Sequence, residues 1–275
     1  MNKLNIYQID AFAEEPFKGN PAAVIPLREW LPDELMQQIA MENNLSETVF
    51  FVPLSPEKMK VTGADYHIRW FTPKSEVDLC GHATLASAMV IDKVLHLDTK
   101  FHQIAFITEK AGLLKVGVDN GWYTLDFPSR MPEPCETPAG LLEALGVKEA
   151  VRVMKSRDYF VVLKDESAVA AIKPDFTALA KIDCFGVIVT APGDSADAVS
   201  RCFFPGAGVE EDPVTGSAHC NIIPYWSNAL EKDDLVCRQI SERGGTLVCQ
   251  YRGDRVLMSG KCVLFMEGVI YPAGK

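Results

Sequence analysis

The sequence predicts an α+β protein made of two related halves, and three observations lead to this prediction. The pattern R-x-F-x-P begins at Arg69 and again at Arg201, and each copy is followed by a polar loop and a glycine, Gly81 or Gly216. A repeat of this length indicates duplicated, facing halves. The helix expected after each glycine is rich in small and apolar residues, so it should be buried on all sides. The remaining apolar segments are joined mainly by turns, unlike those of a doubly wound parallel sheet.

In the N-terminal half, Pro32 suits the first turn of a helix, and Asp33 and Glu34 are favourable near its positive end. Asparagines at 43–44 are expected to end that helix. The helix opening near Gly81 is the buried one. Alternating or apolar runs predict strands over 4–12, 22–25, 48–52, 66–71, 103–108, 113–118 and 121–127.

Four prolines between residues 128 and 138 predict an interdomain linker. We therefore expect domains at 1–127 and 128–261, with a C-terminal strand at about 262–275 that can return to the first domain. In the second half, the helix starting near Gly216 contains Pro224, which is expected to kink it. The other expected elements are helices at about 139–146 and 175–181 and strands over 159–163, 185–190, 201–205, 235–239, 246–251, 255–258 and 262–270.

The composition narrows the classes of function. The chain has 275 residues, 48% of them hydrophobic, and a formal charge of -10, which argues against a nucleic-acid partner. It has no apolar run of membrane-spanning length and no signal peptide, so we expect a cytoplasmic protein without a membrane partner. The eight cysteines form no C-x-x-C pair and are expected to be reduced. No phosphate loop or G-x-G-x-x-G follows a strand, so no nucleotide cofactor is expected.

Glu47 is the first candidate for chemistry, because it lies between a helix end and the apolar strand Val49–Val52. A carboxylate at the start of an apolar strand can be partly desolvated, which favours its protonated form and suits acid–base catalysis. The alternative is a solvated loop glutamate.

His82 is the second candidate, since it falls in the first turn of the buried helix. Free N–H groups at a helix start bind anions, and an imidazole beside them can hold or protonate a substrate. The alternative is a histidine that caps its own helix. Cys80 and His82 could ligate zinc, but no further ligands are evident, so no metal site is expected. Cys80 as a nucleophile would need an activating neighbour.

The third candidate segment precedes the second small-residue helix. Pro213 moves Asp212 out of helical geometry, Gly216 allows close backbone approach, and Ser217 opens the helix. The alternative is an ordinary helix that Asp212 and Ser217 cap, and Glu210–Glu211 are expected to be solvated. Because the first half has the same arrangement, the two helix N-termini are predicted to face one ligand.

Two further polar segments are weaker candidates. Gln239–Gly245 has a plain turn as its simplest interpretation, and Gly19-Asn20-Pro21 is a turn of the same kind.

Taken together, these segments resemble the PhzF-like family, named for the phenazine-biosynthesis isomerase. The resemblance spans nearly the whole chain, in the family's order. It rests on Gln8–Phe12, Gly19–Val24, Ser46-Glu47-Thr48, Arg69–Pro73, Cys80–Thr84, Asp212–Ala218 and Gln239–Gly245.

The resemblance implies a diaminopimelate epimerase-like fold: two similar domains related by a pseudo-twofold duplication, each a mostly antiparallel or mixed sheet around a central helix, with the site between them. It also implies a homodimer without cofactor or metal. In the family, the glutamate equivalent to Glu47 is the acid–base residue, and the residues equivalent to His82, Asp212 and Ser217 surround the substrate.

Backbone at Gly81 and Gly216, together with Asn20, is expected to bind substrate. The epimerase relatives use two cysteines. Here the loop Pro213–Thr215 holds none, which argues against a two-cysteine racemase.

The predicted function is therefore a cofactor-independent isomerase that moves a proton on a small carboxylate by acid–base catalysis. The first alternative is an epimerase or racemase of a small amino or hydroxy acid, which needs a second acid–base group such as Asp212 or Cys80. The second alternative is a carboxylate-binding or protein-interaction module without catalysis.

Overall fold

The computed structural model describes residues 3–95 and 102–272. It divides into two compact units, which we call the N-terminal unit (residues 1–126 and 259–275) and the C-terminal unit (residues 127–258). The predicted N-terminal domain also contains residues 1–2, 96–101 and 273–275, which lie outside the described residues. Among the described residues, no helix is long and apolar enough to cross a membrane.

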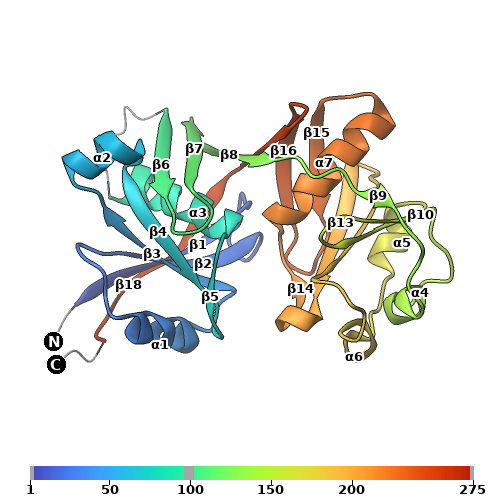
Figure 1. Ribbon diagram of the computed structural model, residues 1–275, viewed down its shortest axis with the longest axis horizontal. Coiled ribbons are helices and arrows are strands. Elements are labelled where there is room, and N and C mark those ends of the chain that lie inside the picture. The colour runs from blue at the N-terminus through green and yellow to red at the C-terminus, as the bar shows by residue number, and fades with distance from the viewer. Residues whose placement is uncertain (1–2, 96–101, 273–275) are drawn as a thin grey trace. The chain divides into compact units, whose positions relative to one another are not determined.

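The N-terminal unit is built on one mixed sheet (Figure 1). Neighbouring strands pair in the order β18–β1–β2–β3–β4–β6–β7–β8. The pairs β2–β3 and β4–β6 are parallel and the others antiparallel, and the short β5 also pairs with β4. The strands are β1 (Leu4–Ala11), β2 (Asn20–Pro26), β3 (Glu47–Pro53), β4 (Tyr66–Phe71), β5 (Glu76–Val77), β6 (Gln103–Ile107), β7 (Leu113–Asp119), β8 (Trp122–Pro128) and β18 (Cys262–Ile270).

The central helix of this unit is α3 (Gly81–Met89), which packs against β1, β2, β3, β7 and β18. All its residues from His82 to Met89 are buried, as small and apolar side chains on every face predict. It continues into a π-helical turn, η1 (Val90–Val94), where the buried Asp92 accepts a hydrogen bond from Tyr123. A second helix, α1 (Asp33–Asn43), packs on β3 and β4, and α2 (Pro56–Thr62) joins these strands.

The C-terminal unit has a sheet of the same kind, ordered β9–β10–β11–β12–β13–β15–β16. Its central helix is α7 (Gly216–Leu230), which continues past Pro224. Its strands are β9 (Glu133–Pro134), β10 (Arg152–Lys155), β11 (Tyr159–Val162), β12 (Val187–Pro192), β13 (Ala198–Phe204), β14 (Val209–Asp212), β15 (Asp234–Gln239), β16 (Gly245–Tyr251) and β17 (Arg255–Gly260). Its short helices are α4 (Leu141–Leu145), α5 (Glu166–Ala170), α6 (Phe176–Leu179) and η2 (Pro205–Ala207).

Strand register shows that the two units repeat one topology. β4 pairs in parallel with β6, with Tyr66 opposite Phe106, and β13 pairs in parallel with β15, with Ala198 opposite Cys237. In both units a short strand then pairs antiparallel with the strand that carries R-x-F-x-P: β5 with β4, and β14 with β13. The predicted α+β fold of two similar halves is therefore confirmed.

Several elements lie outside the sequence predictions. Helices α2 and α5 and strand β10 were not expected, and the proline-rich linker includes the short strand β9. Ser55 caps α2 by accepting a hydrogen bond from the Lys58 amide, and Asp165 caps α5 in the same way through Ala168. These local side-chain caps satisfy amides of the first turn and explain where the two short helices begin.

Candidate functional site

Glu47 is the first residue of β3, and Ala22 of the parallel strand β2 lies opposite it. Asn20 begins β2 and is fully buried, so two of the predicted site residues lie at the same end of adjacent strands. The Glu47 side chain is 17% exposed, which makes it partly desolvated but still accessible.

His82 lies in the first turn of α3 and faces Glu47. Its Nε2 is 3.1 Å from Glu47 Oε2, and its side chain is only 7% exposed. Neither atom makes a hydrogen bond of good geometry with another described residue. On the other edge of the ring, Nδ1 is 3.4 Å from the Cys80 thiol. The sequence predictions for Glu47, His82 and Gly81 therefore fall on one cluster in the N-terminal unit.

Charge is unevenly distributed in this cluster. Burial alone would lower the pKa of His82, but the negative charges available on Cys80 and Glu47, with their hydrogen bonds to the ring, raise that pKa well above its ordinary value. Burial, followed by the neighbouring Glu47, raises the pKa of the Cys80 thiol to about 11, so this thiol is protonated at neutral pH. The imidazole of His82 therefore lies between the carboxyl group of Glu47 and the thiol of Cys80.

Glu47, Cys80 and His82 also have metal-ligand chemistry, and one donor atom from each lies within 4.8 Å of the others. The sequence alone did not identify Glu47 as a third ligand for the Cys80–His82 pair. A metal would require a thiolate at Cys80 and would break the Glu47–His82 ion pair.

The N-terminus of α3 carries no side-chain cap and no acidic residue in its first turn. The same is true of α7, where Thr215 is the N-cap residue. Uncapped N–H groups carry partial positive charge, so both helix starts favour anions such as carboxylates.

In the C-terminal unit, Asp212 ends β14 and Ser217 is the second residue of α7. The Thr215 hydroxyl is 2.5 Å from Asp212 Oδ2 instead of capping the helix. The alternative in which Asp212 and Ser217 are ordinary caps of α7 does not describe this arrangement, because Thr215 is the N-cap residue and Ser217 lies inside the helix.

The expectation that Glu211 is solvated is wrong. Arg201 donates two hydrogen bonds to its carboxylate, at 2.7 and 2.8 Å, and the Glu211 side chain is 19% exposed. Arg69 and Glu76 form the same bidentate pair at the same two distances in the N-terminal unit. The repeated arginines therefore anchor the short strands β14 and β5 to the R-x-F-x-P strands.

Sequence reasoning missed two residues near Ser217 and Asp212. Arg157 lies 3.4 Å from the Ser217 hydroxyl, stacks over Phe185 and pairs with the buried Asp158. Gln239 bonds to the loop that carries Asp212. The only signal for Gln239 was its presence in the weaker candidate segment Gln239–Gly245, for which a plain turn was the simplest interpretation; Arg157 had no signal in the sequence.

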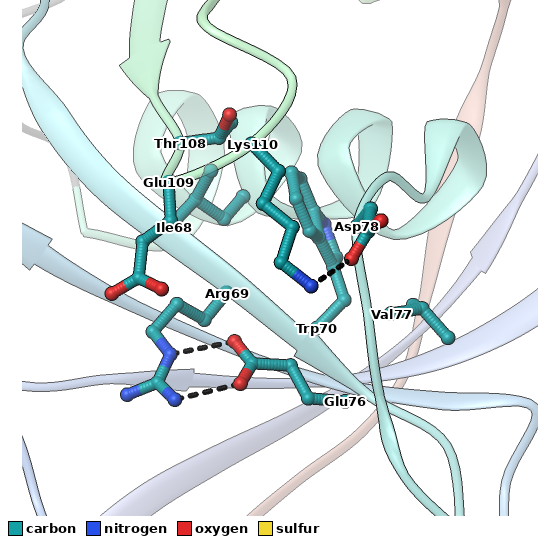
Figure 2. A pocket seen from close by; sticks show the side chains of 9 residues that line it. All are labelled: Ile68, Arg69, Trp70, Glu76, Val77, Asp78, Thr108, Glu109 and Lys110. Atoms are coloured by element: carbon teal, nitrogen blue, oxygen red, sulfur yellow. Dashed lines mark hydrogen bonds and ion pairs between the residues drawn. The ribbon is translucent and has the colours of Figure 1, made fainter.

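A small cavity in the N-terminal unit has none of Glu47, Cys80 and His82 among its lining residues (Figure 2). Arg69 bonds to Glu76 at its base, and Lys110 bonds to Asp78 across it at 2.7 Å. Because these charges are already paired with one another, the cavity is a poor receptor for a charged substrate. Its lining residues are Ile68, Arg69, Trp70, Glu76, Val77, Asp78, Thr108, Glu109 and Lys110.

Comparison with known proteins identifies the family. Residues 9–268 match the family model described as phenazine biosynthesis-like protein. The chain is 51% identical over 269 residues to a Pseudomonas aeruginosa protein named "uncharacterized isomerase", an alignment that covers 98% of this chain and 99% of that protein. These matches show that the chain belongs to the phenazine biosynthesis-like family.

Solved structures agree with this assignment. A crystal structure of a phenazine biosynthesis protein of the PhzF family from Enterococcus faecalis shares 47% sequence identity, with a TM-score of 0.91 over 98% of this chain and all of that one. A hydroxyproline epimerase from Agrobacterium vitis has a TM-score of 0.61 at 10% identity, covering 98% of this chain and 92% of that one, and at that distance the likeness shows the fold alone.

Proposed function

The chain belongs to the phenazine biosynthesis-like family, and from this membership and the Glu47 cluster we propose that it is a cofactor-independent isomerase acting on a small carboxylate metabolite. Glu47 is the acid–base residue that moves the proton. The observation that carries the proposal is the contact between the partly exposed carboxyl group of Glu47 and the buried imidazole of His82, 3.1 Å apart at an uncapped helix start.

The proposed mechanism begins with the Glu47 carboxylate, which His82 orients from 3.1 Å away. The carboxylate takes a proton from an acidic carbon of the substrate, which leaves an electron-rich, enolate-like intermediate. The N–H groups at the start of α3 stabilise the negative charge that develops on the substrate. The neutral Glu47 then returns its proton at another carbon. One group that accepts and returns the same proton is sufficient for a 1,3-shift.

Asp212 and Ser217 complete the proposal as substrate-binding residues. Their support is the repeated motif and the uncapped start of α7, which favours a carboxylate. Arg157, beside Ser217, adds a cation to the same helix start. We therefore assign recognition of substrate anions and hydroxyls to the C-terminal unit and proton transfer to the N-terminal unit.

Epimerisation is the second candidate, because the Cys80 thiol lies 3.4 Å from His82 and is a possible second proton donor. Inversion needs acid–base groups on opposite faces of one carbon. Cys80 and Glu47 instead flank the same imidazole ring, on its two edges. This arrangement favours proton return by Glu47 and a shift between carbons.

Solvent deuterium exchange tests the proposal. A panel of small carboxylates is first screened by thermal shift, and compounds that stabilise the protein are incubated with it in deuterium oxide. An isomerase gives a product with its double bond or hydroxyl moved, and an epimerase gives label at an inverted carbon without a shift. Stabilising compounds that undergo neither reaction would leave only a binding function.

A further inference from the structure

Gln239 is a buried residue at the end of β15, with an exposed fraction of 1%. Both ends of its carboxamide bind the loop that connects β14 to α7. Nε2 donates to the Asp212 carbonyl at 2.6 Å and to the Thr215 hydroxyl at 3.1 Å. Oε1 accepts from the Thr215 amide at 2.8 Å. One side chain therefore holds both ends of the loop.

These bonds fix the direction of the Thr215 hydroxyl. A hydroxyl has one hydrogen to donate, and Gln239 Nε2 can only donate to it. The Thr215 hydrogen is thus free to point at Asp212 Oδ2, 2.5 Å away. The result is a directed chain in which Gln239 donates to Thr215 and Thr215 donates to the carboxylate of Asp212.

Neighbouring residues brace the same loop from a second point. The Ser241 hydroxyl donates to the Pro213 carbonyl at 2.7 Å and accepts from the Gly244 amide at 3.0 Å. The segment Gln239–Gly244, which resembles a plain turn in the sequence, is therefore the support of the Asp212 loop.

The N-terminal unit shows that the fold does not require this glutamine. Arg69 and Arg201 are equivalent, and strand register makes Thr108 the position equivalent to Gln239. The Thr108 hydroxyl is buried and makes no hydrogen bond with a described residue. The same topology therefore forms with a short side chain where the loop carries no aspartate at the position of Asp212.

We propose that Gln239 and Thr215 are positioning residues that set the orientation of the Asp212 carboxylate toward the substrate. The inference rests on the proposed function, in which Asp212 contacts the substrate. Gln239 acts on the backbone at both ends of the loop, and Thr215 acts on the carboxylate itself. Neither residue takes part in proton transfer to carbon.

Two isosteric comparisons test this proposal. Thr215→Val keeps the shape of the side chain and removes the hydroxyl, whereas Thr215→Ser keeps the hydroxyl. Gln239→Leu removes the carboxamide and keeps much of its bulk. Gln250→Leu is the control, because Gln250 lies on the neighbouring β16 and its side chain bonds to Asp234 and Arg252 rather than to the Asp212 loop.

The first readout is hydrogen exchange of the amides of Asp212 and residues 214–217, which needs no substrate. Gln239→Leu should speed their exchange about tenfold or more, the size expected for losing a buried hydrogen bond network, while Gln250→Leu leaves them unchanged. Unchanged exchange in Gln239→Leu would overturn the role of Gln239. This result stands whether or not the proposed isomerase activity is found.

The second readout is the kinetics of the reaction identified by deuterium exchange. Thr215→Val should lower kcat about ten- to a hundredfold with KM changed less, because the lost bond is to a charged group. Thr215→Ser should restore most of the rate. Equal losses in the two variants, or a loss confined to KM, would make Thr215 a structural residue only.

Discussion

The start of α3 and the start of α7 have the same backbone plan and different chemistry. Each helix begins with glycine after an extended residue, without a side-chain cap. At α3 the neighbouring side chains are Cys80 and His82, which form a buried cluster with Glu47. At α7 they are Thr215 and Ser217, which offer hydroxyls near Asp212 and Arg157.

The shared parts of the two helix starts are the ones that hold backbone in place. The Arg69–Glu76 and Arg201–Glu211 pairs have matching distances, and each guanidinium lies 5.2 Å from a phenylalanine ring of its own strand. A duplicated framework can therefore keep two anion-binding helix starts while its loops diverge. One loop came to carry a proton-transfer group and the other a hydrogen-bonding group.

The loops before the helices also differ in how they are tied down. Buried Gln239 and Ser241 hold the loop of the C-terminal unit. At the equivalent place in the N-terminal unit, an exposed Lys110–Asp78 ion pair spans the cavity of Figure 2. Exposed ion pairs contribute little to stability, so the loop that precedes His82 is expected to be the less rigid of the two.

Glu47→Gln tests the chemical side of this comparison and has the largest expected effect. It keeps the shape of the side chain and removes the titratable group, so kcat should fall on the order of a hundredfold or more while folding is preserved. Ser217→Ala, at the other helix start, should lower kcat/KM by about tenfold or less. Steady-state kinetics on the identified substrate measures both.

Glu42→Gln is the matched control for this prediction, because Glu42 is an exposed residue of α1. It should behave as the wild type. Near-wild-type turnover of Glu47→Gln would remove Glu47 from the mechanism, and a larger loss in Ser217→Ala than in Glu47→Gln would reverse the assignment of the two units.

Two buried histidines, His82 in α3 and His219 in α7, make the folding stability depend on pH in opposite directions. Burial lowers the pKa of His219 to about 4, and its Nδ1 lies 2.8 Å from the Thr215 carbonyl. Thr84 occupies the equivalent place in α3 and donates its hydroxyl to the Cys80 carbonyl. Between pH 6.5 and about 4 the unfolded chain binds a proton at His219 that the folded protein does not, so stability falls as pH falls, by up to about 3 kcal/mol.

His219→Thr, which copies the residue of α3, should remove much of this acid sensitivity. The measurement is the denaturation midpoint at pH 5 and pH 7.5 for both proteins. His82 has the opposite sign: its stabilisation is complete below pH 6.5 and is lost as pH rises through its raised pKa, so His82→Asn should flatten the alkaline side of the profile. If the stability of His219→Thr falls between pH 7.5 and pH 5 as much as that of the wild type, His219 is not the source of the acid sensitivity.

Arg69→Lys and Arg201→Lys show how strongly each arginine stabilises the short strand that it binds, β5 or β14. Lysine keeps the charge and loses the bidentate geometry, which costs about 1–2 kcal/mol at a partly buried pair. Arg201→Lys should be the more destabilising, because Arg201 also donates to the Ile172 carbonyl at 2.8 Å, whereas Arg69 also pairs with the exposed Asp33. Urea denaturation of both variants measures the loss in the free energy of unfolding. A larger loss in Arg69→Lys than in Arg201→Lys would reverse the ranking.

The sequence predicted the parts of this protein that periodic patterns and repeats encode. The two small-residue helices, most strands and the doubled topology follow from apolar periodicity and from R-x-F-x-P. Side-chain partnerships that join distant segments did not follow: Glu211 with Arg201, and Gln239 with the Asp212 loop. Such contacts depend on strand register, which brings together residues 10 and 27 positions apart and leaves no local mark on the sequence.

Thr108→Gln has the smallest expected effect and tests the comparison most finely. If Thr108 and Gln239 are equivalent, a glutamine at 108 should reach across the cavity of Figure 2 to the backbone of Val77 and Cys80, as Gln239 reaches Asp212 and Thr215. The gain should be about 0.5–1 kcal/mol, since new buried hydrogen bonds are partly offset by the entropy lost in ordering the side chain.

Thr108→Leu separates the hydrogen bonds from simple filling of the cavity, because leucine supplies apolar bulk without an amide. Glutamine should slow hydrogen exchange of the amides of residues 77–81 and leucine should not, since only the carboxamide can bond to that loop. Because exchange reports the loop and the denaturation midpoint reports the whole unit, the two measurements together show where the glutamine acts. If the glutamine variant is less stable than the leucine variant, Thr108 and Gln239 are equivalent in strand register, but a glutamine at 108 does not reach its loop as Gln239 does.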